Sequence, residues 1–107
     1  MSEVAEQGFI RAEAVRWSAD EPLPGLVEIE LTDADGHVWR FVDKAPVFDA
    51  ENVLTPTTQY PVGISVACTI IERRDDRVVV DTAQPWGVES DGVARFIVHS
   101  DQVSIRG

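Results

Sequence analysis

The side chains that most often bind metals or act as nucleophiles are few in this chain, and their spacing does not match a known metal or catalytic motif. There are two histidines, His37 and His99, and a single cysteine, Cys68. A structural zinc site normally shows closely spaced ligand pairs such as Cys-x-x-Cys or His-x-x-x-His, and neither spacing occurs here. We therefore expect no metal and no other cofactor, with both histidines at the surface or the rim of the fold.

Nucleophilic catalysis is not indicated either. His99, Ser100 and Asp101 are the residue types of a catalytic triad, but consecutive residues of a strand point to opposite faces and cannot converge. Cys68 stands in an apolar strand pattern, where burial raises the pKa of a thiol and makes it inert. The glycines are isolated and form no phosphate-binding loop. The sequence thus predicts a non-enzymatic protein without catalytic residues.

Carboxylates gather at the predicted turns. The order Asp33-x-Asp35-Gly36 is also that of the start of a calcium-binding loop, but Lys44 and its neighbours occupy the closing region, where a glutamate is required. Aspartate is favoured in turns because its side chain hydrogen-bonds the local backbone. We therefore interpret these residues as turn formers and not as metal ligands.

The overall negative charge limits which kinds of molecule the protein is expected to bind. The chain has 19 acidic and nine basic residues, a formal net charge of −10. Residues 1–54 contain twelve acids and four bases, whereas residues 55–107 contain seven acids and five bases. Nucleic acids and anionic membranes are bound through clustered Lys and Arg, so we expect neither as a partner. The acidic surplus serves either solubility or the electrostatic attraction of a basic partner.

Alternation with a period of two predicts strands along most of the chain. Residues 26–33 and 37–43 alternate apolar and polar side chains on either side of an Asp-Gly turn, which predicts a β-hairpin. Residues 9–18 have alanines and Glu13 in the middle, which leaves a helix open. A strand is favoured there, because a turn at residues 22–25 leads it into the hairpin. Further predicted strands are 62–73, 77–82 and 93–100, with a short edge strand within 101–105.

The segment after the hairpin is predicted to be irregular. Pro46 excludes a central strand position, because proline cannot donate to the ladder of hydrogen bonds. Residues 49–61 contain two prolines and several turn-forming residues, with room for a single helical turn at 49–53 capped by Asp49.

Together these elements predict an all-β fold: a small antiparallel barrel or sandwich of six to seven strands in mostly meander order. A barrel is favoured because both faces of residues 62–71 are apolar. Residues 1–8 are expected to be a flexible N-terminus ahead of a single β domain over 9–107. The acidic N-terminal residues and the lack of a long apolar run predict a cytoplasmic protein without a membrane span.

Two functions of different classes remain open. The first is a non-enzymatic acidic binding module that engages a protein with a basic surface, for example an inhibitor or immunity-type protein covering a basic active site. Its expected contact residues are the exposed acids of the first hairpin and a later aromatic loop: Glu28, Glu30, Asp33, Asp35, Trp86 and Glu89. Arg40 is expected to sit across the hairpin from Glu30 and to neutralise part of that surface.

The second function is a small-molecule-binding β-barrel with an aromatic-lined pocket near Trp39, Phe41 and Trp86. A pocket above about 300 Å³ lined by these side chains would favour it, and a filled interior would favour the binding module. The sequence indicates no oligomeric state.

Overall fold

The computed structural model describes residues 6–48, 54–84 and 87–105. Strands make up most of them, with one short α-helix and one 3₁₀ turn. The elements are β1 (Glu6–Ala19), β2 (Leu26–Thr32), β3 (Val38–Lys44), α1 (Ala45–Phe48), β4 (Val62–Arg74), β5 (Arg77–Asp81), β6 (Arg95–His99), η1 (Ser100–Gln102) and β7 (Val103–Ser104). Every named strand pair is antiparallel, which confirms the predicted all-β class.

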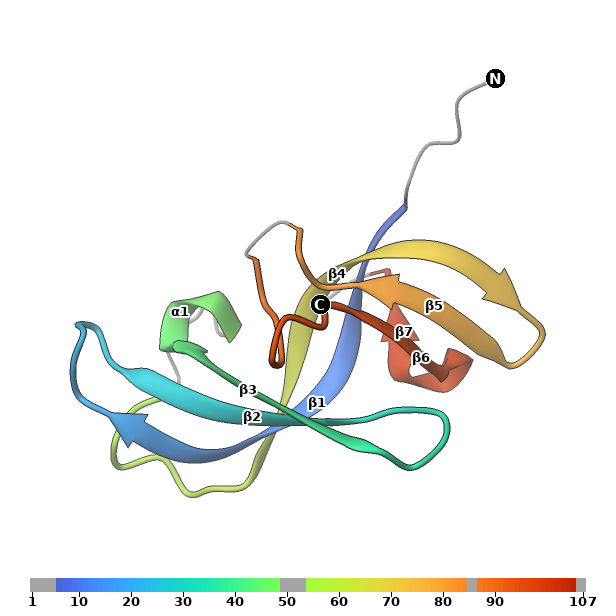
Figure 1. Ribbon diagram of the computed structural model, residues 1–107. Helices are drawn as coiled ribbons and strands as arrows, with labels where there is room; N and C mark the ends of the chain where they lie inside the picture. The colour runs from blue at the N-terminus through green and yellow to red at the C-terminus, as the bar shows by residue number, and fades with distance from the viewer. Residues whose placement is uncertain (1–5, 49–53, 85–86, 106–107) are drawn as a thin grey trace.

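The strands form one sheet in the order β3-β2-β1-β4-β5-β6, with β7 paired to β1. Two meanders, β1-β2-β3 and β4-β5-β6, are joined by the pairing of β1 with β4. The sheet curls into a half-barrel (Figure 1). The β2–β3 turn helps to hold the curl, because the Ala34 N–H donates a hydrogen bond of 2.9 Å to the Ile97 carbonyl of β6. A single curled sheet therefore takes the place of a sandwich.

The first hairpin has the predicted form. Each β2 residue pairs with one β3 residue without a bulge, from Leu26 with Lys44 to Thr32 with Val38. Gly36 has a φ of 82° and lets the chain reverse in the turn. The alternation predicted from the sequence places Val27, Ile29 and Leu31 in the core, all 0 % exposed.

β1 is a strand along its whole length, although alanines occupy its middle. Ala12 and Ala14 are buried at the centre of the sheet, where β1 pairs with β4 on one side and with β2 or β7 on the other. The strand begins at Glu6, three residues before the predicted start of the strand at residue 9. Gly8 makes this possible, because a Cβ there would lie 2.9 Å from Ile70 Cδ1 and 3.0 Å from the Ser104 carbonyl oxygen.

The interior of the half-barrel is filled by side chains. Val66 and Cys68 of β4 point into it at 1 % exposure each, as the alternation predicts. The opposite face of β4 is only partly covered, and Ile71 is 39 % exposed. Although both faces of residues 62–71 are apolar, only one face of β4 is buried, because the sheet curls around one core and leaves its outer surface to solvent.

The segments around Pro46 and residue 101 differ in detail from the predictions. A helical turn forms at Ala45–Phe48 and buries Ala45 and Phe48, whereas the turn predicted at 49–53 lies outside the described residues. The expected edge strand at 101–105 is a 3₁₀ turn followed by the two residues of β7. None of the described helices has the length and apolar character needed to cross a membrane.

Candidate functional site

Two of the predicted acidic contact residues lie on the outer face of β2, and each faces an arginine. Glu30 is directly opposite Arg40, and Arg40 Nε lies 3.2 Å from Glu30 Oε2, which confirms the expected cross-hairpin pair. Glu28 is opposite Arg16 of β1, with Arg16 Nη2 and Glu28 Oε2 3.4 Å apart. That oxygen is shielded from solvent and accepts no hydrogen bond from a described residue, so this ion pair is a loose one.

The two turn aspartates are also engaged within the fold. Asp33 Oδ1 accepts hydrogen bonds from the backbone N–H groups of Asp35 at 2.9 Å and His37 at 3.0 Å. Asp33 Oδ2 accepts the indole N–H of Trp39 at 2.9 Å. Partial burial alone would raise the pKa of Asp33, but these hydrogen bonds and the nearby His37 outweigh it and lower the pKa below its usual value. Asp35 Oδ1 lies 3.2 Å from Nη1 of Arg77 in β5.

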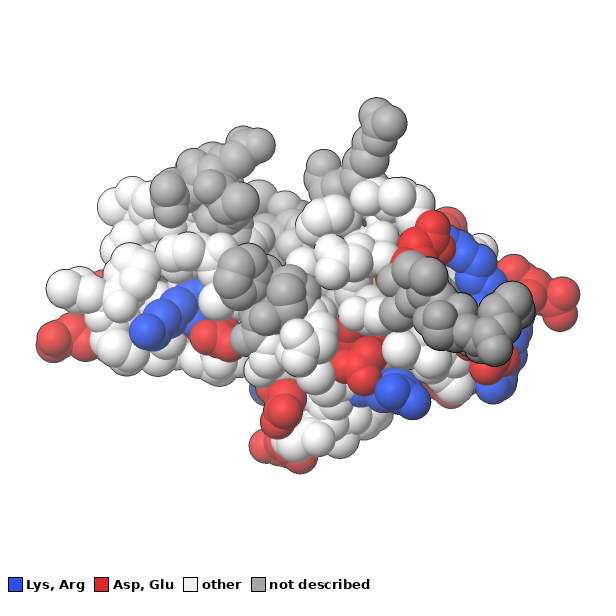
Figure 2. All heavy atoms as spheres, turned by 90° about the horizontal axis from the view of Figure 1, so that it is seen from above, with Lys and Arg blue, Asp and Glu red and all other residues white. Residues whose placement is uncertain are grey.

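These partners change the character of the predicted acidic surface. Each of the four hairpin acids has a counter-ion or a set of hydrogen-bond donors from the chain itself. On the face seen in Figure 2, acidic and basic side chains alternate and do not merge into one acidic field. The four residues are therefore mainly turn and ion-pair residues, and their charge is largely matched locally.

The predicted aromatic loop is described only in part. Trp86 lies outside the described residues, and Glu89 is exposed. The side chains on either side of Glu89 are buried: Val88 is 1 % and Ser90 is 8 % exposed. Thr82, which is 0 % exposed, fixes this loop by donating a hydrogen bond of 2.7 Å from its hydroxyl to the Val88 carbonyl. Glu89 therefore projects from a well-anchored loop.

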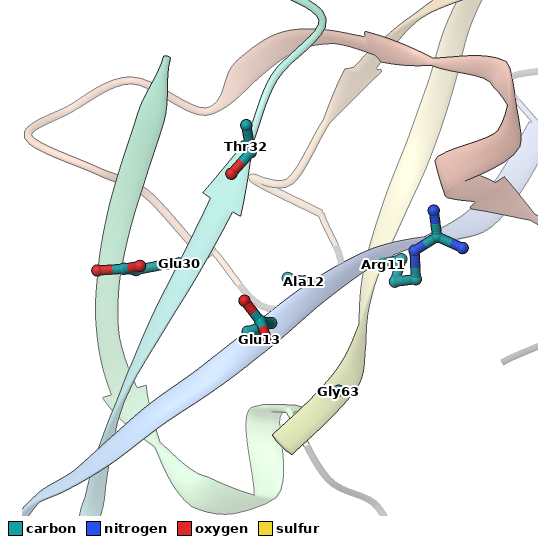
Figure 3. Close-up of a pocket in the computed structure, with 6 residues that line it drawn as sticks. All are labelled: Arg11, Ala12, Glu13, Glu30, Thr32 and Gly63. Atoms are coloured by element: carbon teal, nitrogen blue, oxygen red, sulfur yellow. The ribbon is translucent and has the colours of Figure 1, made fainter. Parts of the chain in front are cut away.

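A pocket that the sequence did not predict lies where β1 changes partner. β1 pairs with β2 as far as the pair Glu13 and Glu30, and then with β7 at Phe9 and Ile10. The strands diverge between these points and leave a pocket of about 330 Å³ (Figure 3), which we call the fork pocket. Its lining comes from β1, β2 and the start of β4: Arg11, Ala12, Glu13, Glu30, Thr32 and Gly63.

Two acidic residues of neighbouring strands, Glu13 and Glu30, line the fork pocket together with Arg11 (Figure 3). Glu13 and Glu30 are directly opposite on neighbouring strands, an arrangement that costs about 0.2–1 kcal/mol when both are charged. Glu30 has Arg40 as its counter-ion, whereas Glu13 is exposed and forms no ion pair with a described residue. Across the other edge of β1, Glu13 pairs with Gly63, where an added Cβ would meet nothing within 4 Å. The pocket is thus acidic on one wall and open at Gly63.

The fork pocket was missed because it depends on distant pairings. The alternation of Glu13 with Ala12 and Ala14 already places Glu13 on the outer face. Its position opposite Glu30, however, requires knowing that β1 lies between β2 and β4 and that β7 takes over at Ile10. A local pattern contains no signal for that exchange.

A second surface pocket, the rim pocket, lies beside β3. It also measures about 330 Å³ and is lined by His37, Val38, Trp39, Arg40, Ser90 and Asp91. The Trp39 ring is held at its indole N–H by Asp33 and meets the Phe96 ring edge-on, with centroids 5.1 Å apart. Phe41, expected in an aromatic ligand pocket, is instead 2 % exposed in the core. Of the aromatic residues expected in such a pocket, Trp39 therefore lines a surface pocket and Phe41 is part of the core.

The described residues offer little for metal or nucleophilic chemistry. They contain no group of three or more His, Cys, Asp or Glu residues that could hold a metal ion. Both His37 and His99 are exposed, as predicted. Burial raises the pKa of the Cys68 thiol to about 11, so the thiolate is scarce at neutral pH.

Comparison of the chain with protein-family models, with curated proteins and with solved structures finds no match. The function is therefore argued from the site alone.

Proposed function

We propose that this protein is a non-enzymatic acidic binding module that receives a basic side chain of a partner protein in the fork pocket. The carrying observation is that Glu13 and Glu30 are directly opposite in the fork pocket, and that Glu30 is paired with Arg40 whereas Glu13 has no ion pair with a described residue. A guanidinium or ammonium group placed between the two carboxylates relieves their mutual repulsion and pairs with Glu13. Such charge-assisted hydrogen bonds are stronger than neutral ones.

Two further features support a protein partner over a small molecule held inside a barrel. Buried side chains of all the long strands pack in the interior, which disfavours a ligand enclosed there. The net charge of −10 attracts a basic partner over a distance of about 8–10 Å at ordinary ionic strength. The fork pocket then provides a specific contact, which the long-range attraction by the net charge does not.

The test uses a matched pair of small probes on the intact chain. Acetyl-arginine amide carries the cation, and acetyl-citrulline amide has nearly the same shape without the charge. Titration of labelled protein by NMR is expected to shift the amide signals of Glu13, Glu30 and Gly63 with the arginine probe only. Equal shifts with both probes, or shifts confined to other strands, would contradict the proposal.

Variants of the pocket sharpen that test. Glu13→Gln removes the unpaired charge, and Gly63→Leu fills the open side without backbone strain, since nothing lies within 4 Å of a Cβ there. Both are expected to abolish the response to arginine while the rest of the spectrum is retained. Glu21→Gln removes the same charge from an exposed position outside the pocket and is the control that keeps the response.

The partner itself is sought by comparing captured proteins from the source cell for the parent chain and for Glu13→Gln. The proposal expects a basic protein that binds the parent, is lost with Glu13→Gln, and associates more slowly as salt rises. A partner whose association is insensitive to salt and to Glu13→Gln would place recognition elsewhere on the molecule.

A further inference from the structure

β3 is an end strand of the sheet, and its outer edge has a regular row of backbone groups. The Asp33 N–H donates to the His37 carbonyl at 2.9 Å, and the register continues without a bulge to Leu26 and Lys44. Hydrogen-bonded and non-hydrogen-bonded pairs alternate along an antiparallel ladder. Val38, Arg40 and Val42 are therefore in non-hydrogen-bonded pairs with β2, so their N–H and C=O groups point away from it.

The side chains of the same three residues form an outward-facing row. Val38 is 44 % and Val42 is 51 % exposed, and the Arg40 side chain between them is 66 % exposed. Arg40 binds Glu30 through Nε, and its terminal nitrogens make no hydrogen bond to a described residue. One end of the guanidinium is thus available to a carboxylate on the far side of β3.

The other end of the sheet is different. β6 also has only one strand neighbour, but its outer edge is engaged by the β2–β3 turn through the Ala34 to Ile97 hydrogen bond. Lys44, at the end of β3, has its own N–H bonded to the Asp43 side chain at 2.8 Å. Residues 38–42 are consequently a stretch of outer edge with a run of outward backbone groups.

We propose that β3 accepts an extended segment of another protein as an additional antiparallel strand. The segment has apolar side chains opposite Val38 and Val42 and an acidic side chain opposite Arg40. Backbone hydrogen bonds to an exposed edge supply the affinity in this mode of recognition, and alternate side chains supply the selectivity. The positive charge of Arg40 favours an acidic residue at the centre of the added segment. The rim pocket beside Val38 and Arg40 leaves space at the Val38 end of β3. This site is on a different edge from the fork pocket, and the two are connected through the Arg40–Glu30 ion pair.

The test uses the peptide acetyl-Thr-Val-Thr-Glu-Thr-Val-Thr-amide, whose two valines and glutamate fall on one face of a strand. NMR titration is expected to shift the amides of Val38, Arg40 and Val42 and to slow their exchange with solvent. A peptide with Lys in place of Glu is expected to bind roughly two- to five-fold more weakly, from the usual size of a cross-strand charge pair. The substitution Arg40→Glu is expected to reverse that preference.

A proline variant separates backbone addition from simple surface contact. Val42→Pro removes one outward N–H without removing a bond to β2, because proline is tolerated where the N–H of an edge strand faces solvent. Binding is expected to be lost in Val42→Pro and retained in Val42→Thr, which keeps the N–H. If Val42→Pro does not fold, Val38→Pro removes the N–H at the other end of the row and gives the same comparison.

The Asp91 carboxylate lines the rim pocket together with Arg40, so Asp91→Asn is expected to strengthen binding of the acidic peptide. The proposal would be overturned if both proline variants bound the peptide as well as the parent. Shifts on other strands, or no binding at millimolar peptide, would also overturn it. Concentration-dependent shifts of β3 amides without peptide would show a second copy of the chain on this edge, and would equally overturn the proposed partner.

Discussion

Trp39 donates its indole N–H to Asp33 Oδ2 at 2.9 Å, so one carboxylate holds both the hairpin turn and a wall of the rim pocket. Asp33→Asn replaces one carboxylate oxygen by an amide nitrogen, which cannot accept a hydrogen bond. The single remaining oxygen cannot accept both the indole N–H and the backbone N–H groups of the turn. We expect the free energy of unfolding to fall by about 1 kcal/mol. Urea unfolding at pH 7 measures this, with Asp35→Asn as the control for loss of charge.

The same carboxylate makes stability depend on acid. The folded-state pKa of Asp33 is lowered, so its contribution is present above the unfolded pKa and is lost as the pH falls through the folded value. Between pH 5 and pH 2 the parent should lose more unfolding free energy than Asp33→Asn. Parallel pH profiles for the two proteins would show that Asp33 makes no such contribution.

Cys68 gives the opposite dependence at alkaline pH. Its pKa is raised from 9.0 to about 11 by burial, so the unfolded thiol ionises first. The free energy of unfolding should then fall between pH 9 and pH 11, by up to about 1.4 kcal/mol per pH unit, and Cys68→Ala should remove this fall. A thiol reagent at pH 8 should label the native chain slowly and the unfolded chain fast. Equal labelling rates would contradict the burial of Cys68.

Thr82 tests how the loop that contains Glu89 is anchored. Its hydroxyl donates to the Val88 carbonyl at 2.7 Å, and Thr82 is completely buried. Thr82→Val keeps the shape but leaves that carbonyl without the hydroxyl donor, at a cost of about 1–3 kcal/mol. Thr82→Ser, which keeps the hydroxyl, is expected to lose less. A thermal unfolding series would contradict this role if the serine variant were the less stable of the two.

Gly25 and Gly36 form a matched pair for backbone strain. Both have a positive φ, 119° and 82°, but a Cβ at Gly25 would lie 2.0 Å from Trp17 Cζ2, whereas one at Gly36 meets nothing within 4 Å. Gly36→Ala is expected to cost about 1 kcal/mol through φ alone. Gly25→Ala should cost clearly more and change the tryptophan fluorescence of the native state. Similar losses for both variants would mean that Trp17 does not pack on Gly25.

The sequence predicted those features that neighbouring residues determine. The hairpin follows from an Asp-Gly turn between two alternating runs, and the pair of Arg40 with Glu30 follows from the hairpin register. The β4–β5 and β5–β6 pairs likewise join consecutive strands. These parts needed only local geometry and the exclusion of apolar side chains from water.

The features that were missed depend on residues far apart in the chain. Asp35 is matched by Arg77, 42 positions later, and nothing in the turn sequence indicates that β5 lies nearby. Alanine has low strand propensity, yet Ala12 and Ala14 are buried because β1 lies at the centre of the sheet, between β2 and β4. Two counter-ions of the predicted acidic surface, Arg16 and Arg77, also come from other strands, so the turn sequence alone does not indicate them.

The pairing of Phe9 with Ser104 also constrains the order in which the protein can be made and become active. During synthesis, β1 can pair with β2 as soon as β2 has been made. Its opposite edge can pair only after β4 has been made. Its pairing with β7 at Phe9 and Ile10 comes almost the full length of the described chain later. Sheets closed by such remote partners fold in about milliseconds to seconds. The lining of the fork pocket comes from β1, β2 and the start of β4, so a nascent chain should lack this pocket until β4 has been released.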